Sequence, residues 1–273
     1  KGDKSKPTIH SKDYKSPDAY KDKRVAVIGN GCSGCEIAVE VSTVAKHVTH
    51  VTRNTTWILP LYILEKPLAL LIYTREGASK TQKMTREAAN IAWHTFLRSV
   101  LPQEKATADL TVVTPLTETA FTQISDGYVE AVKNEKVVIQ KEVPEDTEAL
   151  IFCTGYEPEF PFFEHDILNA IGYQPQDHVQ PLLLHKTVFC PDLQNLGFVG
   201  CYKGTLFGVI ELQARWVTMV FSGKIPYPSA ETMAKGIAEE KKIREHWPRL
   251  QFSHDNYVEF SDDLASEIGA LPD

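Results

Sequence analysis

The residues best suited to bind a ligand form a glycine-rich turn near the start of the chain. Gly29, Gly31 and Gly34 are spaced as Gly-x-Gly-x-x-Gly. An apolar, mostly β-branched run precedes them at residues 25–28, and apolar residues at helical spacing follow at residues 37–44. This strand–turn–helix context is typical of a dinucleotide site, because the N–H groups that begin the helix face the phosphates. The alternative is a glycine-rich turn that binds nothing.

Each glycine has its own role in this prediction. Gly29 allows the tight turn, Gly31 lets the backbone approach the pyrophosphate, and Gly34 lets the helix lie close to the strand. The residues of the turn that we expect to contact the nucleotide are Gly29, Asn30, Gly31, Cys32, Ser33, Gly34 and Glu36.

The second strand of the predicted unit ends in a residue that selects between nicotinamide nucleotides. Residues 48–53 alternate β-branched and polar types, which favours a parallel strand that ends at Thr52 and Arg53. Units that bind NAD place a carboxylate about 20 residues past the glycine turn, on the ribose 2′-hydroxyl. Arg53 instead stands 24 positions after Gly29, and a guanidinium pairs with the 2′-phosphate of NADP. The sequence therefore favours NADP, with a solvated strand-end arginine as the alternative.

Two cysteines in the turn indicate thiol–disulfide chemistry as an alternative. Cys32 and Cys35 form a Cys-x-x-Cys pair at the expected helix start, where the helix dipole lowers a thiol pKa. Both, however, occupy variable positions of the nucleotide turn, so we interpret them as small residues that fill it rather than as a disulfide-reductase pair. The five cysteines are odd in number and mostly scattered, which is typical of free thiols in a reducing compartment and favours a cytoplasmic location.

Composition limits the class of protein. The 273 residues are 42% apolar, with 29 basic and 36 acidic side chains and a net charge of −7. No basic block stands out, so we expect no nucleic-acid partner. The most apolar stretch, residues 57–73, is interrupted by two prolines and two charged residues, too broken for a membrane span of ~20 residues. We expect no membrane span and no metal site.

A further candidate for ligand contact follows a buried strand later in the chain. Residues 149–153 are apolar, and Thr154, Gly155 and Tyr156 come directly after them. Ligands of open α/β sheets bind beyond the carboxyl ends of the strands, which makes these three residues candidates for a second contact.

Other patterns predict elements without chemistry of their own. Apolar residues at helical spacing predict helices over residues 85–100 and 229–247, the second with solvated charges. Residues 129–132 and 136–140 are expected to form short strands.

Five segments, taken in order, match the motifs of one enzyme family. They are His10-Ser11-x-x-Tyr14-Lys15-x-Pro17, the glycine turn as far as Ala38, Phe152-Cys153-Thr154-Gly155-Tyr156, residues 197–200 with 211–216, and residues 255–257 with 262–264 and 268–269. Cysteine replaces the family's alanine at Cys153. The chain resembles the class B flavin-containing monooxygenases over nearly its whole length.

The resemblance implies a reaction that two cofactors carry. In this family NADPH passes hydride to FAD, and reduced flavin takes O2 to a C4a-hydroperoxyflavin that oxygenates a soft nitrogen or sulfur nucleophile of a small molecule. The resemblance also implies flavin contacts at Gly208 and Gln213, with ordinary helix packing as the alternative. It identifies no catalytic side chain, because the protein's part is positioning, electrostatics and exclusion of water.

The implied fold is α/β, with a Rossmann-like NADPH-binding domain inserted into an FAD-binding domain. Residues 1–22 form a connecting arm of the FAD domain, residues 23–152 the NADPH-binding domain, and residues 153–273 the carboxyl-terminal part of the FAD domain. The family's first glycine turn, which binds FAD, has no counterpart in this sequence, and residues 1–4 look like a chain entered midway. We therefore expect catalysis to need an N-terminal FAD-binding segment or chain, and the isolated chain to be inactive.

Three functions remain open from the sequence. The first is the NADPH- and FAD-dependent oxygenation of nitrogen or sulfur. The second is the Baeyer–Villiger class, whose signature expects Trp where Tyr14 stands. The third is a non-catalytic, NADP-binding half-protein or regulatory module. A homo-oligomer also remains open.

Overall fold

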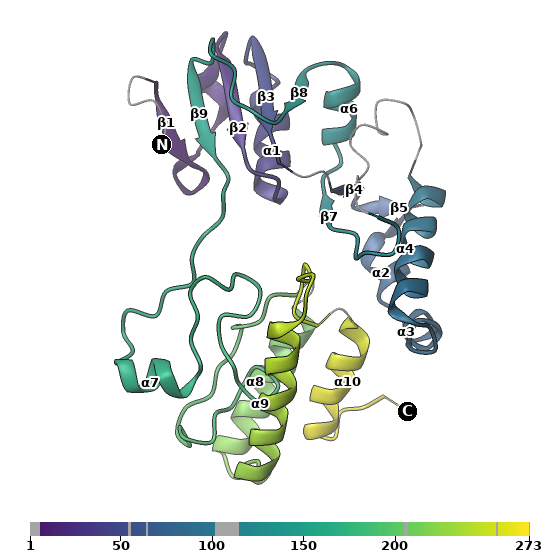
Figure 1. Ribbon diagram of the computed structural model, residues 1–273, viewed down its shortest axis with the longest axis vertical. Coiled ribbons are helices and arrows are strands. Elements are labelled where there is room, and N and C mark those ends of the chain that lie inside the picture. Colours follow the sequence, from purple (N-terminus) through teal and green to yellow (C-terminus); the bar gives the residue numbers. More distant parts are fainter. Residues whose placement is uncertain are drawn as a thin grey trace. The chain divides into compact units, whose positions relative to one another are not determined.

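The chain folds into two units in a computed structural model (Figure 1). The structure describes residues 6–53, 56–63, 65–101, 115–204, 207–254 and 256–272. Unit 1 comprises Lys1–Ile72 and Thr81–Tyr156, and unit 2 comprises Tyr73–Lys80 and Glu157–Asp273. Residues 1–4 and Asp255 lie outside the described residues, so the motifs there remain sequence observations.

A five-stranded parallel sheet organises unit 1 (Figure 1). Its order is β1-β9-β2-β3-β8, and every neighbouring pair is parallel. The strands are β1 (Thr8–His10), β2 (Arg24–Ile28), β3 (His47–Val51), β8 (Val137–Gln140) and β9 (Ala149–Phe152). Strands β2 and β9 are buried on both faces, which explains why they are nearly continuous apolar runs. The predicted α/β fold is confirmed.

Two helices pack on one face of this sheet. Helix α1 (Cys32–Val41) and helix α6 (Tyr128–Lys133) share a buried cluster with the strands. Its members include Val25, Val27, Cys35, Ile37, Ala38, Val41, Val48, Tyr128 and Ala131. The strand that we predicted over residues 129–132 is wrong. Tyr128 and Ala131 are buried three positions apart, which is the spacing of a helix face and not of a strand.

Unit 1 also contains a smaller group of short strands and helices outside the five-stranded sheet. Its strands are β4 (Trp57–Leu59) paired in parallel with β7 (Thr122–Ile124), and β5 (Tyr62–Ile63) paired with β6 (Lys66–Pro67). Helices α2 (Leu68–Ile72) and α4 (Arg86–Val100) accompany them. Helix α4 confirms the helix predicted over residues 85–100, and the Thr85 side chain caps it by accepting from the Ala88 N–H.

Unit 2 is helical and is built on an aromatic core. Besides most of α3 (Arg75–Gln82), its helices include α7 (His165–Ala170), α8 (Gly208–Phe221), α9 (Ala230–Glu245) and α10 (Tyr257–Glu267). Phe189 and Trp216 stack edge to face with ring centroids 4.9 Å apart, inside a cluster with Val209, Met233 and Leu264.

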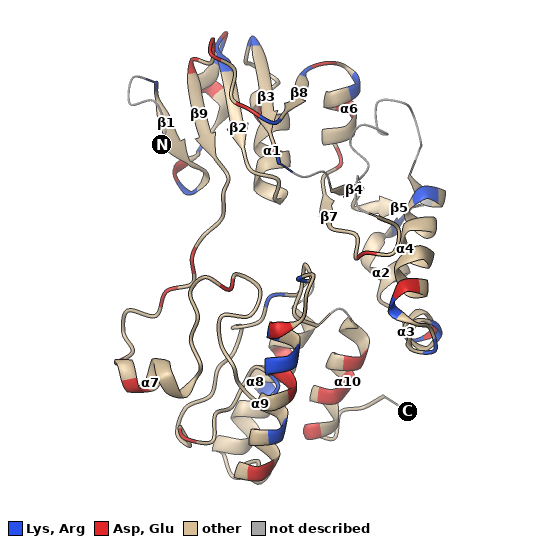
Figure 2. Cartoon of the chain, viewed as in Figure 1, with Lys and Arg blue, Asp and Glu red and all other residues tan. Residues whose placement is uncertain are grey.

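Helix α10 carries four acidic residues and no basic one (Figure 2). Lys186 donates to Glu267 at 2.7 Å, and Arg75 of α3 (Arg75–Gln82) pairs with Asp262. Tyr73 also lies against Tyr257, with ring centroids 5.2 Å apart. The contacts of Arg75 and Tyr73 with α10 explain why Tyr73–Lys80 belongs to unit 2.

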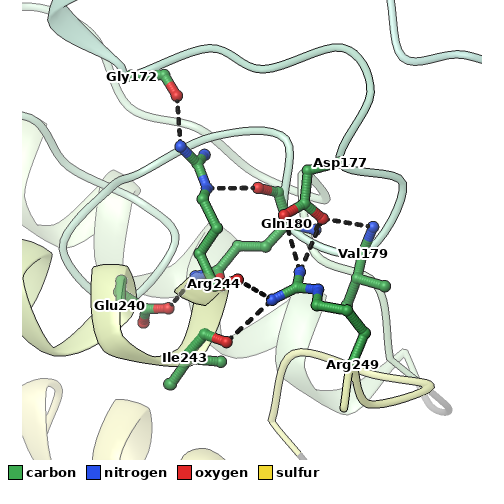
Figure 3. A network of polar contacts seen from close by, with 8 residues as sticks. All are labelled: Gly172, Asp177, Val179, Gln180, Glu240, Ile243, Arg244 and Arg249. Atoms are coloured by element: carbon green, nitrogen blue, oxygen red, sulfur yellow. Dashed lines mark hydrogen bonds and ion pairs between the residues drawn. The ribbon is translucent and has the colours of Figure 1, made fainter. Parts of the chain in front are cut away.

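A buried polar network fastens α9 to a preceding loop (Figure 3). Arg244 donates from Nε to the Gln180 carbonyl at 3.0 Å and from Nη1 to the Gly172 carbonyl at 2.8 Å. Arg249 donates from Nη2 to both carboxylate oxygens of Asp177, at 2.7 and 2.8 Å. The Gln180 amide donates to Glu240. The helix predicted over residues 229–247 is confirmed, but the expectation of solvated charges is wrong for Glu240 and Arg244, which are 5% and 7% exposed.

Among the residues that the structure describes, no helix combines the length and the apolarity that a membrane crossing needs.

Candidate nucleotide site

The glycine turn begins where strand β2 ends, with the backbone held closely between two neighbours. Gly29 has a φ of +124°, and its N–H donates to the Val51 carbonyl of β3 at 3.1 Å. A Cβ on Gly29 would lie 2.2 Å from the carbonyl oxygen of Cys153. Only glycine fits here, because both the left-handed φ and the adjacent backbone exclude a side chain.

Gly34 and Gly31 differ sharply in the space around them. A Cβ on Gly34 would lie 2.0 Å from the Gly29 carbonyl oxygen, so the first turn of α1 packs directly on the glycine turn. Around Gly31, by contrast, no atom of a described residue beyond its two chain neighbours lies within 4 Å of where a Cβ would be. The turn is therefore closed against its own protein at Gly29 and Gly34 and open at Gly31.

Gly31 is also the N-cap of α1, in extended conformation, and among the described residues no side chain caps the helix. The first N–H groups of a helix have no acceptor within it. An anion fits at this point, because the uncapped donors and the positive end of the helix dipole meet the opening at Gly31.

The other residues of the turn surround this opening. Ser33 and Glu36 are exposed, and Asn30 is half-buried. Cys32 is exposed as well, and its thiol donates to Oε1 of Gln123 at 2.9 Å. Cys35 is fully buried, and this burial raises the pKa of its thiol to about 12. Because a reactive cysteine needs an accessible thiolate, the geometry does not favour the disulfide-reductase alternative.

The register of the sheet brings three predicted segments to one edge. Ile28 of β2 pairs with Val51 of β3 and with Phe152 of β9. The residues that follow these strands, the glycine turn, Thr52-Arg53 and Cys153–Tyr156, therefore leave the sheet side by side. This is the carboxyl edge of the parallel strands, where ligands of such sheets bind.

Thr52 is buried after the end of β3, whereas the next residue, Arg53, is exposed. Thr52 is 8% exposed, and its N–H continues the ladder to the Gln140 carbonyl at 2.9 Å. Arg53 is exposed, and no described residue forms a hydrogen bond or ion pair with its guanidinium. Its charge is thus available at the edge where the predicted nucleotide would lie.

Thr154, Gly155 and Tyr156 are all exposed beyond β9. Gly155 has a φ of +82°, and its carbonyl accepts from Nε2 of His10 at 3.1 Å. The His10 ring also lies edge-on to Tyr156, with centroids 5.1 Å apart. The end of β1 therefore holds the segment that follows β9.

Two buried side chains that sequence reasoning missed lie beneath the turn. His50 of β3 is fully buried, and its Nε2 lies 2.7 Å from the Gly29 carbonyl oxygen. Its Nδ1 contacts the Tyr128 hydroxyl, and the two rings meet edge to face at 5.3 Å. Burial lowers the pKa of His50 and raises that of Tyr128. The available signal in the sequence is a histidine in the interior of a strand, between β-branched residues at Thr49 and Val51.

Gly208 and Gln213 lie in unit 2, on helix α8. Gly208 is exposed at the first position of the helix, and a Cβ there would lie 2.6 Å from the Tyr257 hydroxyl. Gln213 is fully buried: its amide donates to Thr187 Oγ1 at 2.6 Å and its Oε1 accepts from the Gly200 N–H at 3.1 Å.

In the part of the chain that the structure describes, no group of three or more His, Cys, Asp or Glu side chains is arranged to hold a metal ion.

Comparison with known proteins identifies the family. The model of the flavin-binding monooxygenase-like family matches residues 3–273. The chain belongs to this family. This chain is 32% identical over 300 residues to a relative, dimethylaniline monooxygenase (N-oxide-forming) 2 of Rattus norvegicus. It is 30% identical over 287 residues to flavin-containing monooxygenase 5 of Homo sapiens. Each match covers 97% of this chain and 52% of the relative. The chain thus spans about half the length of the curated relatives it matches.

Solved structures agree on the fold of this flavin-binding monooxygenase-like chain. S-allyl-L-cysteine S-oxygenase from Allium sativum matches with a TM-score of 0.60 at 20% identity, over 97% of this chain and 49% of that one. Cyclohexanone monooxygenase from Rhodococcus sp. Phi1 bound to NADP+ also matches with a TM-score of 0.60, at 16% identity, over 97% and 68%. The family's description as flavin-binding agrees with the predicted flavin cofactor.

Proposed function

We propose that this chain carries the NADP-binding part and the carboxyl-terminal FAD-binding part of an NADPH- and FAD-dependent monooxygenase. The whole enzyme would transfer one atom of O2 to a soft nitrogen or sulfur nucleophile of a small molecule. The observation that carries the proposal is the sheet edge at which the opening at Gly31, the exposed Arg53 and the segment Thr154–Tyr156 converge. Family membership and relatives that are named as N-oxide-forming enzymes support it.

In this proposal NADP lies along the carboxyl edge of the sheet. Its pyrophosphate would sit over Gly31, on the N–H groups of Cys32 and Ser33 at the start of α1. Arg53 would pair with the 2′-phosphate, which a carboxylate would repel. Thr154–Tyr156 would contact the part of the nucleotide that extends past β9. The remaining loop residues, Gly29, Asn30, Gly34 and Glu36, would shape the turn.

The proposed flavin contacts differ in kind. When bound, FAD supplies the chemistry that activates oxygen. Gly208 fits a direct contact, because it is exposed at a helix start that no described side chain caps. Gln213 fits a supporting role, since both polar atoms of its amide are engaged by Thr187 and Gly200. The chain's own contribution is to bind, orient and exclude water.

The proposed domain organisation keeps residues 23–152 as the NADPH-binding domain, with residues 1–22 and 153–273 as parts of the FAD domain. An N-terminal FAD-binding segment, in the same chain or a second one, would complete the enzyme. We propose a cytoplasmic location from the five cysteines, all of which are free thiols.

Substrate-dependent NADPH oxidation tests the proposed function. The assay would follow NADPH by its nicotinamide absorbance, with N,N-dimethylaniline and with a thioether as substrates. It would use the chain with and without an FAD-binding segment from a relative. We expect oxidation and a flavin absorbance only when the segment is present. A colourless mixture that binds NADPH but oxidises nothing would favour the alternative of a non-catalytic NADP-binding module. Conversion of cyclohexanone to a lactone, without amine oxidation, would favour the Baeyer–Villiger class.

Replacing Arg53 should change which nucleotide binds. Arg53→Ala removes a charge-assisted contact with the 2′-phosphate, which should cost about 1.5–3 kcal/mol, or roughly ten- to a hundredfold in NADPH affinity. NADH affinity should stay unchanged, because NADH lacks that phosphate. Dissociation constants for both nucleotides measure the effect, with Lys46→Ala as the matched control, since Lys46 is an exposed cation before the amino end of β3. An unchanged NADPH/NADH ratio in Arg53→Ala would show that Arg53 does not read the 2′-phosphate.

A further inference from the structure

The Gly29 carbonyl has a buried donor from outside the turn. His50 Nε2 lies 2.7 Å from this oxygen, and the oxygen is also enclosed by α1, since a Cβ on Gly34 would lie 2.0 Å from it. A carbonyl only accepts hydrogen bonds, so Nε2 of His50 carries the proton. The His50 ring is fully buried, and its contact with the carbonyl is partly buried.

Tyr128 contacts the other ring nitrogen of His50. With the proton on Nε2, Nδ1 is an acceptor, and the Tyr128 hydroxyl donates to it. Tyr128 is 2% exposed, on helix α6. The contacts thus form one directed chain from the Tyr128 hydroxyl through the neutral imidazole to the Gly29 carbonyl. Second partners of this kind fix the tautomer and the orientation of a functional imidazole.

The orientation of the Gly29 carbonyl fixes the peptide that follows it. A trans peptide is planar, with its C=O and N–H pointing in opposite directions. Because the Gly29 oxygen points to His50 beneath the turn, the Asn30 N–H points to the other side of the peptide plane. Gly31 and the start of α1 come next in the chain, so a rotated Gly29–Asn30 peptide would misplace the donors that face the opening.

We infer that His50, held by Tyr128, is a positioning residue that fixes the Gly29–Asn30 peptide and thereby sets the affinity of the turn for NADP. This inference rests on the proposed NADP site. His50 would touch no part of the nucleotide, and its effect would pass through the Gly29 carbonyl alone.

The test compares His50→Leu with His50→Gln in the full 273-residue chain. Leucine removes the donor at similar volume, whereas the glutamine amide can still donate to the Gly29 carbonyl. We expect His50→Leu to weaken NADP+ binding in calorimetry by about tenfold or more, and His50→Gln to stay within about threefold of wild type. Tyr128→Phe should fall between them. Val48→Ala is the matched control, because Val48 is fully buried on the same strand and does not contact Gly29 through a polar group.

A second readout needs no nucleotide. Hydrogen–deuterium exchange of the peptide covering residues 28–35 should be faster in His50→Leu than in wild type or His50→Gln. The inference is overturned if Val48→Ala lowers the unfolding temperature as much as His50→Leu does and also weakens NADP+ binding as much. Equal exchange in wild type and His50→Leu also overturns it. A different result would overturn the proposed function instead: the wild-type chain binds no NADP+, but hydrogen–deuterium exchange is still faster in His50→Leu than in His50→Gln. The role of His50 in positioning the Gly29–Asn30 peptide would then still hold.

Discussion

Gly31→Ala should abolish NADP+ binding and leave the folded chain almost unchanged. The Gly31 backbone is extended, with a φ of −90°, and a Cβ there meets no atom of a described residue beyond its two chain neighbours within 4 Å. The free energy of unfolding should therefore change by no more than about 1 kcal/mol. The methyl group would, however, occupy the place of the pyrophosphate, so affinity should fall at least about a hundredfold, which corresponds to roughly 2.8 kcal/mol.

Calorimetric titration with NADP+ measures the first effect, and thermal unfolding without nucleotide supplies the control. A folded Gly31→Ala chain that binds NADP+ as wild type does would mean that the phosphates lie elsewhere. A chain that unfolds would mean that Gly31 serves the fold and that its open space has no bearing on ligand binding.

Gly34→Ala should have the opposite signature, with a large loss of stability. A Cβ on Gly34 would lie 2.0 Å from the Gly29 carbonyl oxygen and 3.1 Å from His50 Nε2. Helix α1 would have to move away from the turn and from the sheet. This movement should lower the free energy of unfolding by about 3 kcal/mol, which exceeds the gain of about 1 kcal/mol in helix propensity. This is a large share of a typical stability of about 5–15 kcal/mol.

Urea unfolding followed by circular dichroism would measure this loss, with Gly31→Ala as the matched control three positions away. The two substitutions add the same methyl group to the same turn, so their difference reports only the surroundings of each glycine. If both variants unfold at the wild-type urea concentration, the close packing of α1 on the turn is not required for stability.

Local patterns were sufficient to predict most of the sheet edge. The glycine turn, the segment Thr52-Arg53 that follows β3, and the segment after β9 are each encoded by neighbouring residues. Parallel strands then place their carboxyl ends together, so local predictions could be combined into one edge. The roles of individual residues at this edge stay predictions.

The side chains beneath the turn could not be predicted in the same way. His50 and Tyr128 are 78 residues apart and meet only through packing of α6 on the sheet. The short apolar run at residues 129–132 fits a strand or a buried helix equally well, so the wrong choice there also concealed the direction of Tyr128. In unit 2, Arg244 is buried because its acceptors, 64 and 72 residues earlier, arrive from a loop with no periodic pattern.

A crystal structure of the 273-residue chain with NADP+ tests the central claim most directly. We expect the pyrophosphate over Gly31, with its oxygens about 3 Å from the N–H groups that begin α1, and the 2′-phosphate paired with Arg53. NADP+ bound away from the carboxyl edge of β2 and β3, or bound there with its 2′-phosphate apart from Arg53, would contradict it.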